Sequence, residues 1–247
     1  MRNRLRTVMF GIGLMILLAQ PAFAEELGQA NITPRTKMAE IRSNPALWVR
    51  ASTPIADQDR VLDRMYWDAQ PLSCLSNHWT AQDAADGLNY LIRTYNAGQR
   101  VTFPLYTAEE IAQDTSRDGV ELYYLPAEGA QANQKYALVI GGNAIVVSAE
   151  IREGISTAWN LHEMGYPVFV LRYRIGMKAS NNAPLQDVVH AVQYITEHAG
   201  QFGVQAEDYA IVSYSSGGRS PDCSAPTRWA TKITACQSPV PCCWATR

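Results

Sequence analysis

The stretch that decides the fold is YAIVSYSSGG, residues 209–218. Its first half, residues 209–212, is a β-branched and aromatic run typical of a buried strand. Its second half is a turn of small residues with Ser215 at the centre, Ser213 two residues before it and Gly217 two residues after it. Small residues are required there because a sharp strand-to-helix turn brings both positions against neighbouring backbone. The stretch therefore predicts a strand ending in a tight turn that presents the Ser215 hydroxyl.

Strands and helices alternate before this stretch. Apolar runs predict strands at 120–125, 136–140 and 168–171, and amphipathic periodicity predicts helices at 149–164 and from Pro184 to about residue 199. A proline suits the first turn of a helix because its missing N–H would have no partner there. This order predicts an α/β fold, with a parallel sheet that has helices on both faces. Sites in such sheets lie beyond the carboxyl ends of the strands.

A second turn of small residues follows the run at 136–140, where Gly141, Gly142 and Asn143 stand. Glycine lets backbone approach a substrate closely. The N–H of Gly142 or Asn143 and the N–H of Ser216 could donate hydrogen bonds to a developing oxyanion. An ordinary strand-ending turn is the alternative interpretation of this segment. A phosphate-binding loop is not predicted, because the chain contains no G-x-G-x-x-G or G-K-[ST] pattern.

The first 24 residues have the pattern of a secretory signal peptide. Three arginines precede an apolar run from Val8 to Ala19, and Ala22-Phe23-Ala24 supplies small residues two apart before Glu25. The apolar run is too short to span a bilayer, although a membrane anchor is the alternative interpretation. We therefore expect an exported protein, periplasmic or secreted, that has no membrane association once the signal peptide is cleaved.

Charge and cysteine usage limit the possible partners. The formal net charge is −2, and removing residues 1–24, with three arginines and no acid, leaves −2 − 3 = −5. Such a mild charge gives no indication of a nucleic-acid partner. Four of the five cysteines crowd into the last residues without C-x-x-C spacing, so no metal site is predicted, and no cofactor.

Several segments together resemble the α/β-hydrolase superfamily. More narrowly, they are similar to the exported bacterial esterase/lipase group that includes acetyl-xylan-esterase-like and feruloyl-esterase-like enzymes. The resemblance covers residues 100–218 approximately. The blocks that carry it are Leu105–Ile111, Gly141–Asn143, Arg152–Gly154, Gly165–Arg174, Ala183–Asp187 and Ser213–Gly218.

The resemblance implies a Ser–His–Asp triad that hydrolyses carboxylic esters through an acyl-enzyme, without a metal. Ser215 matches the nucleophile, and the N–H groups of Ser216 and of Gly142 or Asn143 match the oxyanion hole. The substrate would be a small-molecule or carbohydrate ester, including acetyl esters of sugars. The nucleophile turn does not distinguish an esterase from a serine peptidase or an acyltransferase on the same scaffold.

Apolar residues at helical spacing predict a helix from about Ala81 to Asn96, which Thr80 can cap, in the segment before the sheet. The predicted segments are a signal peptide at 1–24, a mainly helical extension at 25–119, the N-terminal half of an α/β-hydrolase domain at 120–218, and an aberrant or disordered tail at 219–247.

The sequence departs from the family pattern after Gly218. No histidine follows Ser215, and the only acid after it is Asp222. Residues 219–247 contain no Gly, Leu, Phe, Tyr or Met but hold four Cys and four Pro. We interpret this change as a shifted reading frame or a damaged gene, and hence a truncated hydrolase. A genuine disulfide-bonded tail is the alternative.

The missing histidine affects the expected activity. A serine hydroxyl needs an adjacent base and a third group that orients the base. The chain has four histidines, His78, His162, His190 and His198. We expect His162, His190 and His198, which lie on the predicted helices, to be surface or packing residues. His78 lies earlier in the chain. We therefore expect negligible ester hydrolysis and, from an unpaired sheet edge, poor solubility. A catalytically inactive fragment and a non-catalytic binding protein are the alternative functions.

Overall fold

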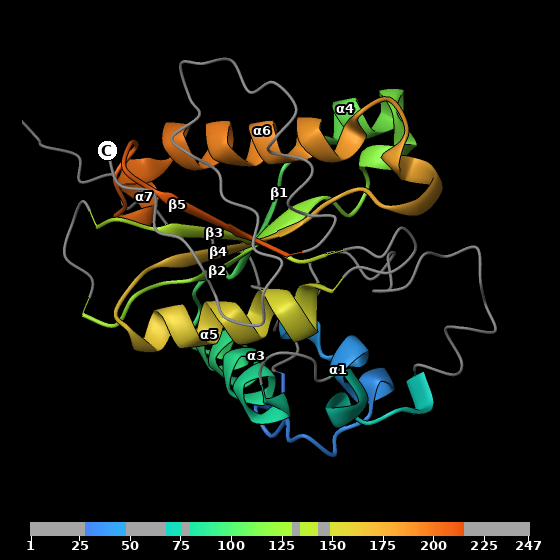
Figure 1. Cartoon of the computed structure of the whole chain (residues 1–247), viewed down its shortest axis with the longest axis vertical. Coiled ribbons are helices and arrows are strands. Elements are labelled where there is room, and N and C mark those ends of the chain that lie inside the picture. Colours follow the sequence, from blue (N-terminus) through green and yellow to red (C-terminus); the bar gives the residue numbers. More distant parts are fainter. Residues whose placement is uncertain (1–27, 48–67, 76–79, 130–133, 143–148, 215–247) are drawn as a thin grey trace, which may run out of the picture.

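A five-stranded mixed sheet forms the centre of the protein, with strand order β1-β2-β4-β3-β5 (Figure 1). The computed structural model describes residues 28–47, 68–75, 80–129, 134–142 and 149–214. The strands are β1 (Thr102–Pro104), β2 (Glu121–Leu125), β3 (Ala137–Ile140), β4 (Val168–Arg172) and β5 (Ala210–Ser213). Strand β3 pairs in parallel with β4 and with β5, which confirms the parallel arrangement predicted for these three strands.

Strands β1 and β2 depart from the predicted all-parallel sheet. Strand β2 pairs with β4 in the antiparallel sense, and β1 pairs with β2 in the same sense. Strand β2 lies next to β4 and not next to β3, and no described helix lies between β2 and β3 to return the chain for a parallel arrangement. Strand β1, which the sequence did not predict, falls within the segment 25–119, so the sheet begins before residue 120.

Helices cover both faces of the sheet (Figure 1). One face carries α1, α3 and α5, and the other carries α4, α6 and α7. The α-helices are α1 (Met38–Ser43), α3 (Ala81–Asn96), α4 (Ala108–Gln113), α5 (Ser156–Glu163), α6 (Ala183–Glu197) and α7 (Ala199–Phe202). A π-helical segment, η4 (Glu150–Ile155), leads into α5. Short 3-10 helices are η1 (Pro45–Leu47), η2 (Leu72–Leu75), η3 (Thr115–Arg117) and η5 (Gly176–Ala179).

The predicted helix 81–96 is confirmed residue for residue as α3, and Thr80 caps it. The Thr80 side chain accepts from the Asp83 N–H and the Asp83 side chain accepts from the Thr80 N–H, which forms a capping box. Helix α3 packs closely on the π-helical segment, because a Cβ added at Gly87 would lie 2.8 Å from Cγ2 of Ile155. The glycine therefore allows the close crossing that builds the core on this face.

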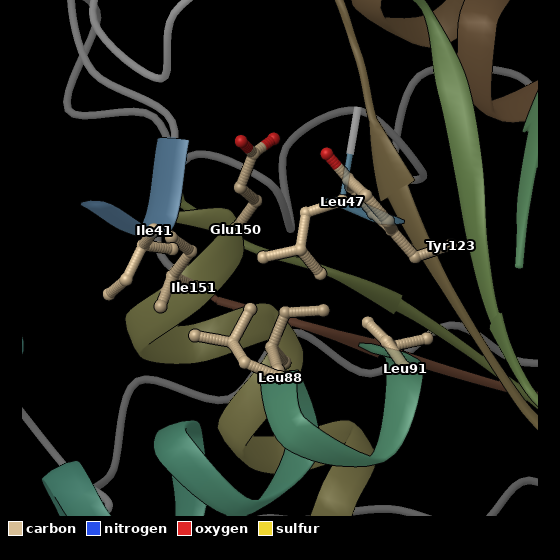
Figure 2. A pocket seen from close by; sticks show the side chains of 8 residues that line it. Ile41, Leu47, Leu88, Leu91, Tyr123, Glu150 and Ile151 are labelled. Atoms are coloured by element: carbon tan, nitrogen blue, oxygen red, sulfur yellow. The ribbon is translucent and has the colours of Figure 1, made fainter. Parts of the chain in front are cut away.

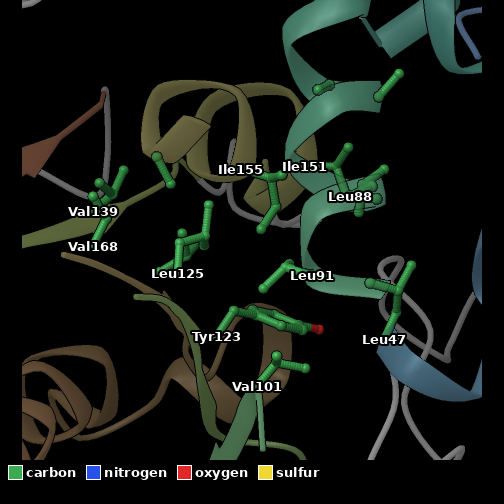
Figure 3. Close-up of a cluster of buried hydrophobic side chains, with 14 of the residues drawn as sticks. Leu47, Leu88, Leu91, Val101, Tyr123, Leu125, Val139, Ile151, Ile155 and Val168 are labelled. Atoms are coloured by element: carbon green, nitrogen blue, oxygen red, sulfur yellow. The ribbon is translucent and has the colours of Figure 1, made fainter. Parts of the chain in front are cut away.

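Successive side chains of the central strands point to opposite faces of the sheet, so the interior contains two hydrophobic cores. In β4, Val168 and Val170 face the core under α3 and α5, while Phe169 and Leu171 face the core under α6. Figure 3 shows the first core, where Leu88 and Leu91 of α3 approach the sheet. Because both faces are covered, the central strands are apolar throughout, which is why they were recognisable as uninterrupted apolar runs.

A buried ion pair ties β4 to α6. Asp187, fully buried on α6, accepts from the backbone N–H of Arg174 at 2.9 Å and from its guanidinium at 2.8 to 3.1 Å. The Tyr106 hydroxyl donates to the same carboxylate at 2.7 Å. The resemblance blocks around residues 106, 174 and 187 therefore meet in one hydrogen-bond network that fixes the start of α6 against the end of β4.

We expect Arg174→Ala to lower the free energy of unfolding by about 3–5 kcal/mol, because it leaves the Asp187 carboxylate buried without its charge partner. Urea denaturation followed by circular dichroism measures the change. Lys135→Ala is the matched control, since Lys135 pairs with Asp208 at 2.9 Å on the surface, where a pair contributes about 1 kcal/mol or less. Equal losses in the two variants would contradict this view of the buried pair.

Candidate functional site

Strands β3 and β5 end side by side at the carboxyl edge of the sheet. Ile140 is the register partner of Ser213, and the Tyr214 N–H donates to the Ile140 carbonyl at 3.1 Å. The segment after β3 and the segment after β5 therefore leave the sheet from adjacent positions. Of the predicted site residues, Gly142 lies in the described part of the chain. Asn143, Ser215 and Ser216 lie outside the described residues, and their roles stay predictions.

The turn after β3 is held closely against the start of η4. A Cβ at Gly141 would lie 2.8 Å from the Ala149 carbonyl oxygen, so only glycine fits this approach. The Tyr173 hydroxyl donates to the Gly141 carbonyl at 2.7 Å, and the Ala149 N–H donates to the Gly142 carbonyl at 2.8 Å. The backbone of this turn is thus fixed from β4 and from η4.

The backbone N–H of Gly142 already has a partner. It donates to Oε2 of Glu153 at 2.7 Å, and Glu153 is only 5% exposed. The sequence predicted either Gly142 or Asn143 as the oxyanion donor of this turn. The single N–H proton of Gly142 is already used in a hydrogen bond within the protein. Sequence reasoning missed Glu153, because a single glutamate on a helix carries no signal of a contact with a distant loop.

A second contact joins the same helical segment to β5. The hydroxyls of Thr157 and Tyr214 lie 2.8 Å apart, and both side chains are buried. Tyr214 directly precedes the predicted nucleophile, so the last described residue before the turn is fixed to α5. Sequence reasoning missed Thr157 as well.

Ser213 occupies the position where the G-x-S-x-G pattern has its first glycine. Its side chain is 2% exposed, and its hydroxyl oxygen has no hydrogen-bond partner among the described residues. The described end of β5 therefore accommodates a hydroxymethyl group here at the cost of an unsatisfied buried hydroxyl.

The described histidines lie away from the carboxyl ends of β3 and β5. His162 and His198 stand at the ends of α5 and α6, and a helix that follows a parallel strand ends at the opposite, amino edge of the sheet. His162 packs on Tyr90 with ring centroids 4.2 Å apart, and burial lowers its pKa. His190 packs on Tyr106, which follows the outermost strand β1, with ring centroids 4.6 Å apart. Their predicted role as packing residues is therefore consistent with the ring contacts.

A buried charged cluster lies on the α3 side of the carboxyl edge. Arg172 pairs with Glu121 at 3.1 Å and lies 3.6 Å from Glu150, whose carboxylate oxygens accept no hydrogen bond from the part of the chain that the structure describes. Figure 2 shows Glu150 and Tyr123 beside apolar side chains of α1, η1 and α3 around a small cavity, with room for about one water molecule. Burial raises the pKa of Glu150 and of Glu121, while Arg172 opposes the rise.

Within the described ranges, no group of three or more His, Cys, Asp or Glu side chains is arranged to hold a metal ion. The same part of the chain contains no helix that is both long enough and apolar enough to cross a bilayer.

One family model matches the central segment of the chain. Residues 122–230 match the model of the BD-FAE family, an esterase-like family of α/β hydrolases. The match spans β2 to β5 and the predicted nucleophile turn, and confirms the α/β-hydrolase resemblance over this segment. It continues past Gly218, where the predicted tail begins, and that boundary stays a prediction. None of the curated proteins compared matches this chain.

Solved structures of hydrolases align with part of the chain. MGS-M1, an α/β hydrolase from a Medee basin deep-sea metagenome library, is 25% identical over 42% of this chain and 45% of its own, with a TM-score of 0.38. An acetyl ester-xyloside bifunctional hydrolase from Caldicellulosiruptor lactoaceticus is 18% identical over 48% and 44%, with a TM-score of 0.41. A truncated carbohydrate esterase from gut microbiota is 26% identical over 41% and 35%, with a TM-score of 0.35. The chain spans less than half of the length of each.

Glu150→Gln is expected to stabilise the protein increasingly as the pH rises from 4 to 8. The pKa of Glu150 is higher in the folded state than its ordinary value, so the folded state loses stability as the pH rises through that pKa. Glutamine does not titrate, so the gain reaches about 1 kcal/mol for each unit by which folding raises the pKa.

Urea denaturation at several pH values measures this gain. Glu207→Gln, at an exposed position, is the control and should change the free energy of unfolding by about 0.5 kcal/mol or less. A gain that is the same at pH 4 and pH 8 would contradict the assignment.

Proposed function

We propose that this chain carries the nucleophile half of a serine esterase site, which attacks carboxylic esters through an acyl-enzyme on Ser215. The observation that supports it is the pairing of Ile140 with Ser213 and of the Tyr214 N–H with the Ile140 carbonyl. The chain therefore leaves β3 and β5 from adjacent positions, which is consistent with an oxyanion loop after β3 and a nucleophile turn after β5. The esterase-like family of residues 122–230 supports the same reaction class.

In the proposed reaction, Oγ of Ser215 attacks the ester carbonyl carbon while a base accepts its proton. The N–H of Ser216 and an N–H from the loop after β3 stabilise the oxyanion. Asn143 is the better of the two loop candidates, because the Gly142 N–H is bonded to Glu153. The alcohol then leaves, and water hydrolyses the acyl-enzyme. The substrate class we propose is a small-molecule or carbohydrate ester, with acetyl esters of sugars the first to test.

Among the described residues, no histidine lies at the carboxyl ends of β3 and β5, where a base for this reaction would stand. His162 and His198 belong to the amino edge, His190 packs beside β1, and the sequence has no histidine after Ser215. This observation favours a second candidate, a chain that retains the hydrolase scaffold without turnover. We also propose, from residues 1–24, that the chain is exported to the periplasm or secreted.

We expect a fluorophosphonate to label Ser215 faster than any exposed serine at pH 9, where hydroxide can remove the proton that no histidine accepts. Peptide mass spectrometry compares the rate at Ser215 with that at Ser180, an exposed serine of the same chain. Ser215→Ala should lose the fast label, and Ser180→Ala should keep it. Labelling of Ser215 no faster than Ser180 in folded protein would overturn the proposed nucleophile.

At pH 7 the chain should hydrolyse p-nitrophenyl acetate at nearly the buffer rate. Removal of a triad histidine typically leaves only the part of catalysis that binding and the oxyanion hole supply. A spectrophotometric assay of the parent and of Ser215→Ala checks this expectation. Rapid turnover that disappears in Ser215→Ala would show that a base is present after all.

A further inference from the structure

One helical segment contacts both halves of the proposed site. Glu153 of η4 accepts the Gly142 N–H after β3 at 2.7 Å, and Thr157 of α5 bonds to the Tyr214 hydroxyl after β5 at 2.8 Å. The two helix residues are four positions apart and therefore lie on one face of the helix.

The Glu153 contact is strong by its geometry and burial. A carboxylate that accepts a backbone N–H makes a charge-assisted bond, which is shorter and stronger than a neutral one. At 5% exposure, water offers the Gly142 N–H little substitute if the carboxylate is removed. A negatively charged oxygen drawn to the Gly142 N–H would also lie beside this carboxylate and be repelled by it.

The helix has an unusual turn at this point. The N–H groups of both Glu153 and Gly154 donate to the Ala149 carbonyl, at 2.9 and 3.1 Å, which marks the entry into the π-helical segment. Such wide turns recur at functional sites because they redirect side chains that a regular helix would point elsewhere. Gly154 lies where a Cβ would come within 2.7 Å of Val170, so the segment also sits directly on β4.

We propose that Glu153 is a positioning residue for the acyl-transfer site. It anchors Gly142 and thereby sets the loop after β3 relative to the turn after β5, which Thr157 holds through Tyr214. Glu153 does not touch the substrate and does not exchange a proton with it. This inference rests on the proposed function, since it assigns Glu153 a part in the reaction at Ser215.

The test uses the full chain with ¹⁵N-labelled glycine and two readouts. The first is the hydrogen-exchange rate of the Gly142 amide, assigned by its loss in Gly142→Ser. The second is the rate of fluorophosphonate labelling at Ser215. The variants are Glu153→Ala, which removes the acceptor, and Glu153→Gln, whose amide oxygen can still accept. Asn160→Ala is the control, because the Asn160 side chain donates within the same helix, to the Ser156 carbonyl at 2.8 Å.

Glu153→Ala should speed exchange at Gly142 and slow labelling at Ser215, each by about tenfold, since a bond to a charged group is worth about 1.5–3 kcal/mol. Glu153→Gln should restore both rates most of the way. Asn160→Ala should lower the free energy of unfolding and leave the labelling rate of the folded protein unchanged. A role in folding alone would not produce rescue by glutamine in the labelling rate.

The outcomes separate this inference from the proposed function. Unchanged exchange at Gly142 in Glu153→Ala overturns the anchoring contact. Faster exchange with unchanged labelling overturns the positioning role while the nucleophile stands. Absence of fast labelling in the parent overturns the proposed function and the positioning role with it, even if Gly142 exchange responds to Glu153.

Discussion

The parallel pairing of β3 with β4 and β5 is the constraint on which the structure depends. It requires helical crossovers, and those crossovers bury both faces of the three strands. Their interiors are consequently made of residues such as Val139, Val170 and Leu171, which are fully buried. The same pairing brings the carboxyl ends of β3 and β5 to adjacent positions, so that the proposed site is a product of the sheet rather than of the loops alone.

Ion pairs of arginines at the end of β4 connect the parallel strands to other elements of the structure. Arg172 pairs with Glu121 and lies close to Glu150 on the α3 side, whereas Arg174 is bonded to Asp187 of α6. Two arginines separated by Tyr173, one at the end of β4 and one just beyond it, thus join the antiparallel part of the sheet, the segment after β3 and the helix before β5. These buried ion pairs lie where several elements meet. They fix the positions of these elements relative to one another more specifically than hydrophobic packing alone.

Much of the central architecture was predictable from the sequence because it rests on local patterns. The uninterrupted apolar runs identified β3, β4 and β5, and helical periodicity with a capping threonine identified α3. Strand β1 was missed because three residues are too few to show an alternating hydrophobic pattern. The antiparallel direction of β2 was missed because it depends on the chain segment that connects β2 to the next strand. Gly142 was found from its place after a strand. The hydrogen bond that engages the Gly142 N–H, and the contacts of Glu153 and Thr157, were not predicted. Contacts between segments far apart in the chain cannot be recognised from the spacing of residues in the sequence.

The π-helical segment has a consequence for how the sequence can change. A wide turn holds one residue more than a regular turn, so deleting a single residue between positions 150 and 155 would let the backbone close into ordinary helix. The helix on either side would keep nearly its original orientation, but the side chains that the wide turn redirects would change direction. Both the length of this stretch and two of its side chains are therefore constrained, because Glu153 accepts the Gly142 N–H and a Cβ at Gly154 would lie 2.7 Å from Val170.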